Sequence, residues 1–208
     1  MDTNTTRNQS KTAKQVNVRY LTATAMLTAV AYILMFFDFS IPMLIPSFIK
    51  MDLSELPALI GSFAMGPMCG VIVCLLKNLL HLTITTTGGV GELSNFILGA
   101  AFVLPAGLIY KHKKTRKSAL LGSLLGAAVM GVLSIVSNYF LVYPFYYNFM
   151  PKETVLAAYQ AILPGMKNIL QCLVCFNMPF TIVKGLISVA ITFVIYKSLS
   201  PILKGVNR

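Results

Sequence analysis

Three polar residues near the C-terminal end of the sequence have a spacing that suits ligand binding. Asn177, Thr181 and Lys184 are spaced i, i+4 and i+7, so they share one face if the helix includes Asn177. The surrounding stretch is apolar, and an ionisable group at the centre of a membrane costs roughly 2.5–3.5 kcal/mol. Lys184 could donate to an anionic or carbonyl-rich ligand, or its amine could reach the lipid headgroups. The two polar neighbours favour the binding role.

Asn138 is a second candidate, because this amide lies deep in an apolar run and is followed by Tyr139 and Tyr143. An amide offers two donors and an acceptor, which suits a heterocycle whose edge alternates donors and acceptors. The same amide could instead make an interhelical hydrogen bond. The sequence leaves both roles open.

A third polar group joins the ends of two apolar stretches. Lys77, Asn78 and His81 end one stretch, and Glu92 and Asn95 begin the next. A structural ion pair between adjacent helix ends is the favoured interpretation. The alternative is a functional role, a proton or ion relay, for which His81 alone is weak support.

Enzymatic chemistry is poorly supported. Cys172 and Cys175 form a C-x-x-C, but both lie in an apolar run without a second ligand pair, which favours buried small side chains over a metal or redox site. His81 and His112 are the only histidines, and no phosphate-binding G-x-x-x-x-G-K-[ST] or zinc-binding H-E-x-x-H occurs. We therefore predict no catalytic residues, no metal and no cofactor. A chain of this kind would bind a solute and take its energy from partner proteins.

The elements that position these residues follow from composition. Of the 208 residues 56% are hydrophobic and only 11% are charged, whereas soluble domains carry about 25% charged residues. The net charge is +11, and the basic residues lie mostly beside apolar runs, which indicates a membrane surface and argues against nucleic acid. The prediction is an all-α polytopic membrane protein, with about six transmembrane helices in one bundle.

Six stretches are long and apolar enough to cross ~30 Å of hydrocarbon as helices. They are residues 18–37, 56–80, 92–110, 118–146, 155–176 and 179–199. Pro164-Gly165 interrupts the fifth stretch and predicts a broken helix there. The apolar, proline-containing segment 38–55 predicts a lid or re-entrant loop. The transmembrane domain is then 18–199, between polar tails at 1–17 and 200–208.

The basic residues conflict over topology. Both tails are basic, which places both in the cytoplasm by the positive-inside rule, and an even number of spans agrees. Three of the predicted spans precede the basic loop KHKKTRK at 111–117, however, which would place this loop outside the cell. The sequence does not resolve this conflict.

Five motifs of the sequence resemble a known family. D-x-S-E-L-P-A-L-I-G-x-F begins at Asp52, and it is followed by K-N-L-L-H and T-T-G-G-V-G-E-L-x-N; SNYFLVYPFYY and NMPFTIVKGLI come later in the chain. Together they resemble the riboflavin-specific substrate-binding (S) component of energy-coupling factor transporters, over roughly residues 18–199. The resemblance implies a six-helix bundle in the bacterial cell membrane that captures riboflavin outside the cell, with FMN as a related ligand. It also implies a transmembrane coupling subunit and two ATPase subunits as partners.

The resemblance also assigns roles to individual residues. The first long loop would close over the ligand, and Asn138, Tyr139 and Lys184 would face the isoalloxazine ring. Thr181 stands where the family has Asn, so the resemblance implies either a shifted ring contact or help from Asn177 there. The small-residue pair Ala25 and Ala29 would dock on the coupling subunit. The loop residues concerned are Phe48, Ile49, Lys50, Met51 and Asp52. The rival interpretation is a stand-alone secondary transporter of another small solute.

Overall fold

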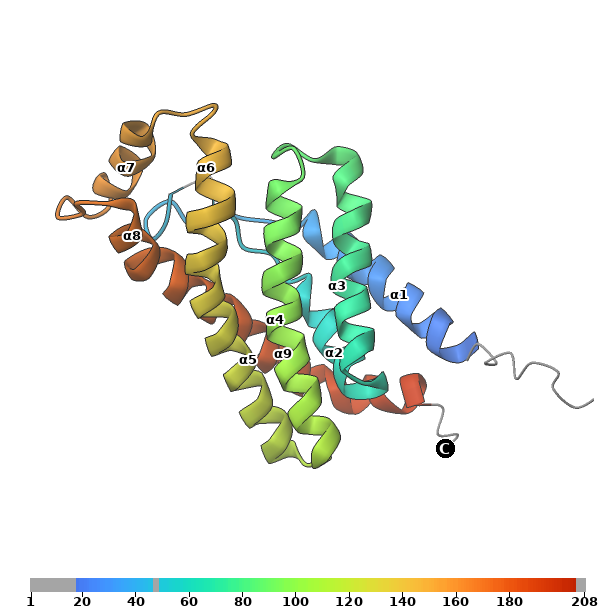
Figure 1. Cartoon of the computed structure of the whole chain (residues 1–208). Helices are drawn as coiled ribbons and strands as arrows, with labels where there is room; N and C mark the ends of the chain where they lie inside the picture. Colours follow the sequence, from blue (N-terminus) through green and yellow to red (C-terminus); the bar gives the residue numbers. More distant parts are fainter. Residues whose placement is uncertain (1–17, 47–48, 205–208) are drawn as a thin grey trace, which may run out of the picture.

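The computed structural model describes residues 18–46 and 49–204, with side chains as far as residue 196. The described chain is a bundle of helices, as predicted (Figure 1). Among the described residues, five helical segments are long and apolar enough to cross a membrane, and α2 is a shorter apolar helix. The principal helices are α1 (Val18–Met35), α2 (Glu55–Met65), α3 (Pro67–His81), α4 (Val90–His112), α5 (Arg116–Ser137) and α9 (Met178–Lys204).

The predicted span at 56–80 is two helices and not one. α2 ends at Met65 and α3 begins at Pro67, with Gly66 between them at φ 105°. Glycine adopts positive φ at little steric cost, and proline suits the first position of a new helix because it has no N–H to donate. Hydropathy does not report either constraint. The apolar stretch 56–80 therefore looks like one continuous helix in the sequence, although the chain turns at Gly66.

The predicted fifth and sixth spans are also rearranged. α7 (Lys152–Gln160) is a short separate helix, and Pro164-Gly165 lies in the turn that follows it. The next long segment runs without a break through α8 (Ile169–Cys172), the π-helical turn η3 (Leu173–Asn177) and α9. Pro179 is separated from this π turn by one residue, and the altered hydrogen-bond pattern there lets a helix pass a proline that cannot donate.

A second π turn has the same relation to a proline. η2 (Asn138–Val142) continues α5 into the short helix α6 (Tyr143–Tyr146), which has Pro144 in its first turn. π turns inside α-helices are frequent at functional sites. Asn138 begins one of these turns and Asn177 ends the other, so both candidate amides lie on irregular backbone.

The corrected helix order removes the topological conflict. Four helices, α1 to α4, precede the basic loop at 111–117, so this loop lies at the same end of the bundle as the start of α1. Figure 1 shows the α4–α5 turn at the lower end, towards which α9 also runs. The basic loop and the start of α1 therefore share one end, which is compatible with the positive-inside rule.

The centre of the bundle packs tightly because α4 and α5 present small residues to each other. A Cβ on Gly122 would lie 2.9 Å from the carbonyl oxygen of Ala106, and one on Gly126 would clash with that of Phe102. Phe102 and Ala127 are almost fully buried at this contact. Close approach of backbones is the usual basis of helix association in membranes.

Candidate ligand-binding site

A cavity of about 510 Å³ lies at the end of the bundle opposite the α4–α5 turn. Its wall combines the end of α1, the loop after it, the end of α3, the start of α4, both π turns and the start of α9. Cavities of roughly 300–1,000 Å³ are typical of small-molecule sites. The lining includes apolar, aromatic and polar side chains, so the cavity suits a ligand with both a flat apolar body and hydrogen-bonding groups.

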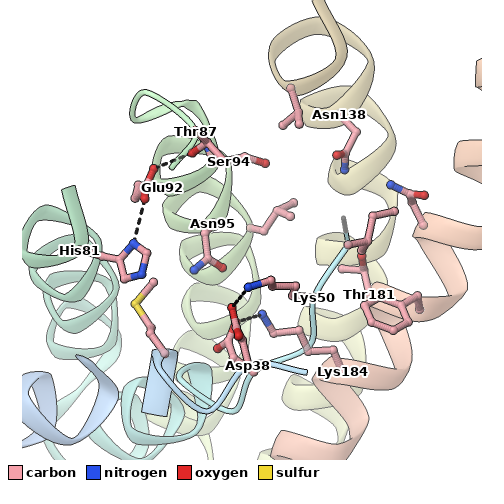
Figure 2. A pocket seen from close by; sticks show the side chains of 18 of the residues that line it. Asp38, Lys50, His81, Thr87, Glu92, Ser94, Asn95, Asn138, Thr181 and Lys184 are labelled. Atoms are coloured by element: carbon pink, nitrogen blue, oxygen red, sulfur yellow. Dashed lines mark hydrogen bonds and ion pairs between the residues drawn. The ribbon is translucent and has the colours of Figure 1, made fainter. Parts of the chain in front are cut away.

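The structure brings most of the predicted binding residues to this cavity. Those that line it are Ile49, Lys50, Asp52, Asn138, Asn177, Thr181 and Lys184. Figure 2 shows Asn138 across the cavity from Lys50 and Lys184. They come from three separate parts of the chain, which the fold alone brings together.

The remaining predicted residues lie elsewhere. Met51 is buried behind the cavity and pairs through its backbone with Phe39 in an isolated antiparallel bridge. Tyr139 is 46% exposed and packs edge-on against Phe140, outside the set that lines the cavity. Phe48 lies outside the described residues. Ala25 and Ala29 are exposed on α1, distant from the cavity lining.

Four charged side chains form the floor. Lys184 Nζ lies 2.9 Å from Asp52 Oδ2 and 3.2 Å from Glu55 Oε2, while Lys77 Nζ lies 3.0 Å from Glu55 Oε1. Lys77 also donates a short hydrogen bond to the Ser54 hydroxyl. Two amines balance two carboxylates, which is the condition under which buried charges are tolerated. Only Lys184 and Asp52 reach the cavity surface.

Asp52 stays ionised in this environment. Burial raises the pKa of its carboxyl, but the positive charges of Lys184 and Lys77 and the hydrogen bonds from Ser54 outweigh that effect. The net result is a pKa well below the usual range, so the Asp52 carboxyl keeps its negative charge at physiological pH. Lys184 is thereby fixed as a positioned donor at the cavity floor.

Both candidate amides are held by side-chain or backbone partners. Asn138 Nδ2 donates to the carbonyl oxygen of Ser134 at 2.7 Å. Asn177 Oδ1 accepts from the Tyr159 hydroxyl at 2.6 Å, and Tyr159 is in turn hydrogen bonded to Tyr143. Since Tyr159 occupies the Asn177 carbonyl, the Asn177 amide N–H groups are the part suited to a ligand acceptor.

The opposite wall contains the polar contact between helix ends that the sequence predicts. His81 Nδ1 lies 2.8 Å from Glu92 Oε1, and Glu92 Oε2 accepts from Thr85 at 2.9 Å and from Thr87 at 3.0 Å (Figure 2). The predicted tie is therefore confirmed for His81 and Glu92. It is wrong for Lys77, which pairs with Glu55 one helix away.

Several lining residues were not predicted from the sequence, among them Asp38, Thr87, Ser94, Met130, Tyr146 and Phe180. Asp38 Oδ2 pairs with Lys50 Nζ at 2.9 Å and, with the Phe39–Met51 bridge, joins the two ends of the loop. Lys50 and Asp38 are well exposed, so this pair contributes little stability. The sequence contained one indication of Asp38, because this carboxylate directly follows the first apolar stretch.

Comparisons with known proteins agree on one family. The family model described as the ECF transporter, substrate-specific component, matches residues 19–196. The riboflavin transporter RibU of Staphylococcus aureus (strain TCH60) is 33% identical over 192 residues, covering 92% of this chain and 95% of that protein. The riboflavin transporter FmnP of Bacillus subtilis (strain 168) is 31% identical over 191 residues, covering 89% and 94%.

A solved structure gives the same result. It is described as the S component of a bacterial ECF transporter, and it superposes on this chain with a TM-score of 0.70 at 32% identity. The match covers 90% of this chain and 98% of the other. The bundle and its helix order are thus similar to those of an experimentally determined relative.

Proposed function

The chain belongs to the substrate-specific components of ECF transporters, and on that premise we propose that it is the high-affinity riboflavin-binding subunit of an ATP-driven vitamin uptake system. The observation that carries the proposal is the cavity, which is lined by Lys184, by the amides of Asn95, Asn138 and Asn177, and by aromatic side chains. Isoalloxazine is a flat aromatic with a donor–acceptor edge. Amides and an amine can pair with that edge, while Phe180 and Tyr146 offer aromatic surface to the ring.

The loop side of the cavity is suited to the ribityl chain. Lys50 and Asp52 line it there, and Thr86 and Thr87 add hydroxyl groups from the α3–α4 turn. Hydroxyl groups need partners that both donate and accept, which this mixed polar rim supplies. FMN would bring a phosphate to the same rim, where Lys50 is exposed.

The protein is a multi-pass protein of the cell membrane that works with an ECF energising module. We place its contact with the transmembrane coupling subunit on the exposed face of α1 that contains Ala25 and Ala29. Two small residues four positions apart allow another helix to approach closely. Two ATPase subunits would complete the complex and supply the energy that this chain has no motif to obtain.

A direct test is a flavin titration of the purified chain. Riboflavin should bind with its fluorescence quenched at micromolar concentration or below, and protein purified from riboflavin-fed cells should be yellow. A colourless protein with no quenching at micromolar concentrations would reject the proposal. Uptake should require co-expressed coupling and ATPase subunits, whereas uptake by this chain alone on an ion gradient would support a secondary transporter.

The orientation in the membrane has its own test. The end with the 111–117 loop should be cytoplasmic because this loop is basic, and the cavity should then open outside the cell. Single cysteines at Lys113 and Glu153, both exposed, report on the two ends once Cys175 is replaced by serine. A membrane-impermeant maleimide should label Glu153→Cys in intact cells and Lys113→Cys only after permeabilisation. The reverse pattern would contradict this orientation.

A further inference from the structure

A second cavity, of about 340 Å³, lies at the opposite end of the bundle from the candidate riboflavin site. The α2–α3 turn and the C-terminal end of α4 form it. Gly107 allows these elements to meet, since a Cβ there would lie 2.9 Å from Pro67 Cα. The Phe63 and Tyr110 rings pack 5.0 Å apart in the same wall. The wall of this second cavity is therefore formed by helices that pack closely against one another.

The lining of this cavity is amphipathic. Its apolar part includes Phe63, Met65, Pro67 and Met68, and Met68 is 59% exposed at the bundle surface. Its polar part includes Lys111 and Lys114, which are exposed where α4 ends, together with the hydroxyl groups of Ser62 and Tyr110. An apolar wall beneath a pair of amines suits an amphiphile that carries negative charge at one end.

Carboxylates are absent from this end among the described residues. Asp38 pairs with Lys50, Asp52 and Glu55 belong to the cavity floor, and Glu92 pairs with His81. Glu153 is on α7, which lies at the other end of the bundle in Figure 1. Lys111 and Lys114 thus share their end with three further basic side chains of the 111–117 loop and with no described carboxylate. The uncompensated positive charge at this end would attract an anion that the described part of the chain does not supply.

We propose that this second cavity binds the phosphate-bearing headgroup of an anionic phospholipid. Lys111 and Lys114 would contact the phosphate, and the first part of an acyl chain would lie along Met65 and Met68. Basic pockets between transmembrane helices at the cytoplasmic surface bind such headgroups, and each nearby lysine strengthens the attraction. The apolar wall distinguishes this ligand from free phosphate, which would gain nothing from it.

The test is native mass spectrometry of the detergent-purified chain after incubation with equal amounts of phosphatidylglycerol and phosphatidylcholine. The parent chain should retain phosphatidylglycerol preferentially. Lys111→Gln/Lys114→Gln should lower that retention about tenfold or more, because two adjacent cationic contacts are lost. Lys113→Gln/Lys117→Gln removes the same charge from the same loop but not from the cavity lining, and it should change retention less than about twofold.

Three results would overturn the proposal. Equal losses in both double variants would mean diffuse attraction to the basic loop and no site. No preference for phosphatidylglycerol in the parent would exclude an anionic headgroup. Displacement of the lipid by inorganic phosphate at matched concentration would indicate a phosphate site without a lipid. Unchanged thermal unfolding midpoints of both variants would show that the substitutions leave the fold intact, independently of flavin binding.

Discussion

Replacing Lys184 by alanine is expected to weaken riboflavin binding tenfold or more. Lys184 is the cationic donor that the fold holds at the cavity floor, 2.9 Å from Asp52 and 3.2 Å from Glu55. A hydrogen bond from a charged donor contributes roughly 1.5–3 kcal/mol, and about 1.4 kcal/mol corresponds to each tenfold change in Kd. The variant also leaves the Asp52 carboxylate at the cavity surface without its lysine partner, and Lys77 alone then balances Asp52 and Glu55. Fluorescence quenching of riboflavin gives the Kd directly.

Lys167→Ala is the matched control, because Lys167 is exposed and lies outside the cavity lining. It should bind riboflavin like the parent. Asn138→Ala tests the facing wall in the same titration and should also lose at least tenfold, since its amide lies on the π turn across the cavity. Parent-like titrations for Lys184→Ala and Asn138→Ala would reject this assignment of the ring site while leaving the proposal of a flavin-binding subunit open.

Replacing Lys77 by methionine is expected to produce the largest loss of stability. The Lys77 side chain is fully buried and pairs with Glu55, whose side chain is only 1% exposed. Removing one partner of a buried ion pair destabilises proteins by about 3–5 kcal/mol, and here Asp52 and Glu55 would share Lys184 as their remaining cation. For a chain of this length that corresponds to a fall of order 10 °C in the thermal unfolding midpoint. A thermal scan of the purified chain in detergent measures it.

The double variant Lys77→Met/Glu55→Met separates charge imbalance from loss of packing. It leaves Asp52 paired with Lys184 and restores a neutral floor, so it should recover a large part of the midpoint lost by Lys77→Met. Lys117→Met, the same substitution at an exposed position of α5, should leave the midpoint unchanged. If Lys77→Met unfolded at the same temperature as Lys117→Met, the four-charge cluster would have no role in stability.

The membrane class and part of the cavity lining could be predicted from sequence for a simple reason. Hydropathy accumulates over about twenty residues, so apolar helices are visible even when their boundaries are not. An ionisable or amide group inside such a stretch is costly enough to indicate a cavity, and Lys184, Asn138 and Asn177 all lie in the lining. Tyr139 shows the limit of this reasoning, because its neighbour Asn138 faces the cavity while Tyr139 is exposed beside Phe140.

The division of the chain into spans needed the tertiary structure. Gly66-Pro67 ends one helix and starts another inside a continuous apolar run, whereas Pro179 stands inside one uninterrupted helix. Proline alone predicts a break in both places. The difference is the π turn before Pro179, which depends on how the backbone packs against its neighbours. Residues 56–80 form two helices where one span was predicted, and the two predicted spans after residue 155 contribute one long helical segment, so the total number is unchanged. The extra helix before residue 111 moves the 111–117 loop to the other side of the membrane.

By itself, the sequence determined that this is a helical membrane protein with a polar interior, and its motifs indicated the family. Only the tertiary structure decided which charges meet. Lys184 and Asp52 are 132 positions apart and come within 2.9 Å, while Lys77 turns to Glu55 and away from Glu92. Local spacing reports which residues share a helix face. The partner across a cavity depends on where the chain turns, and here one glycine with positive φ and two π turns set those directions.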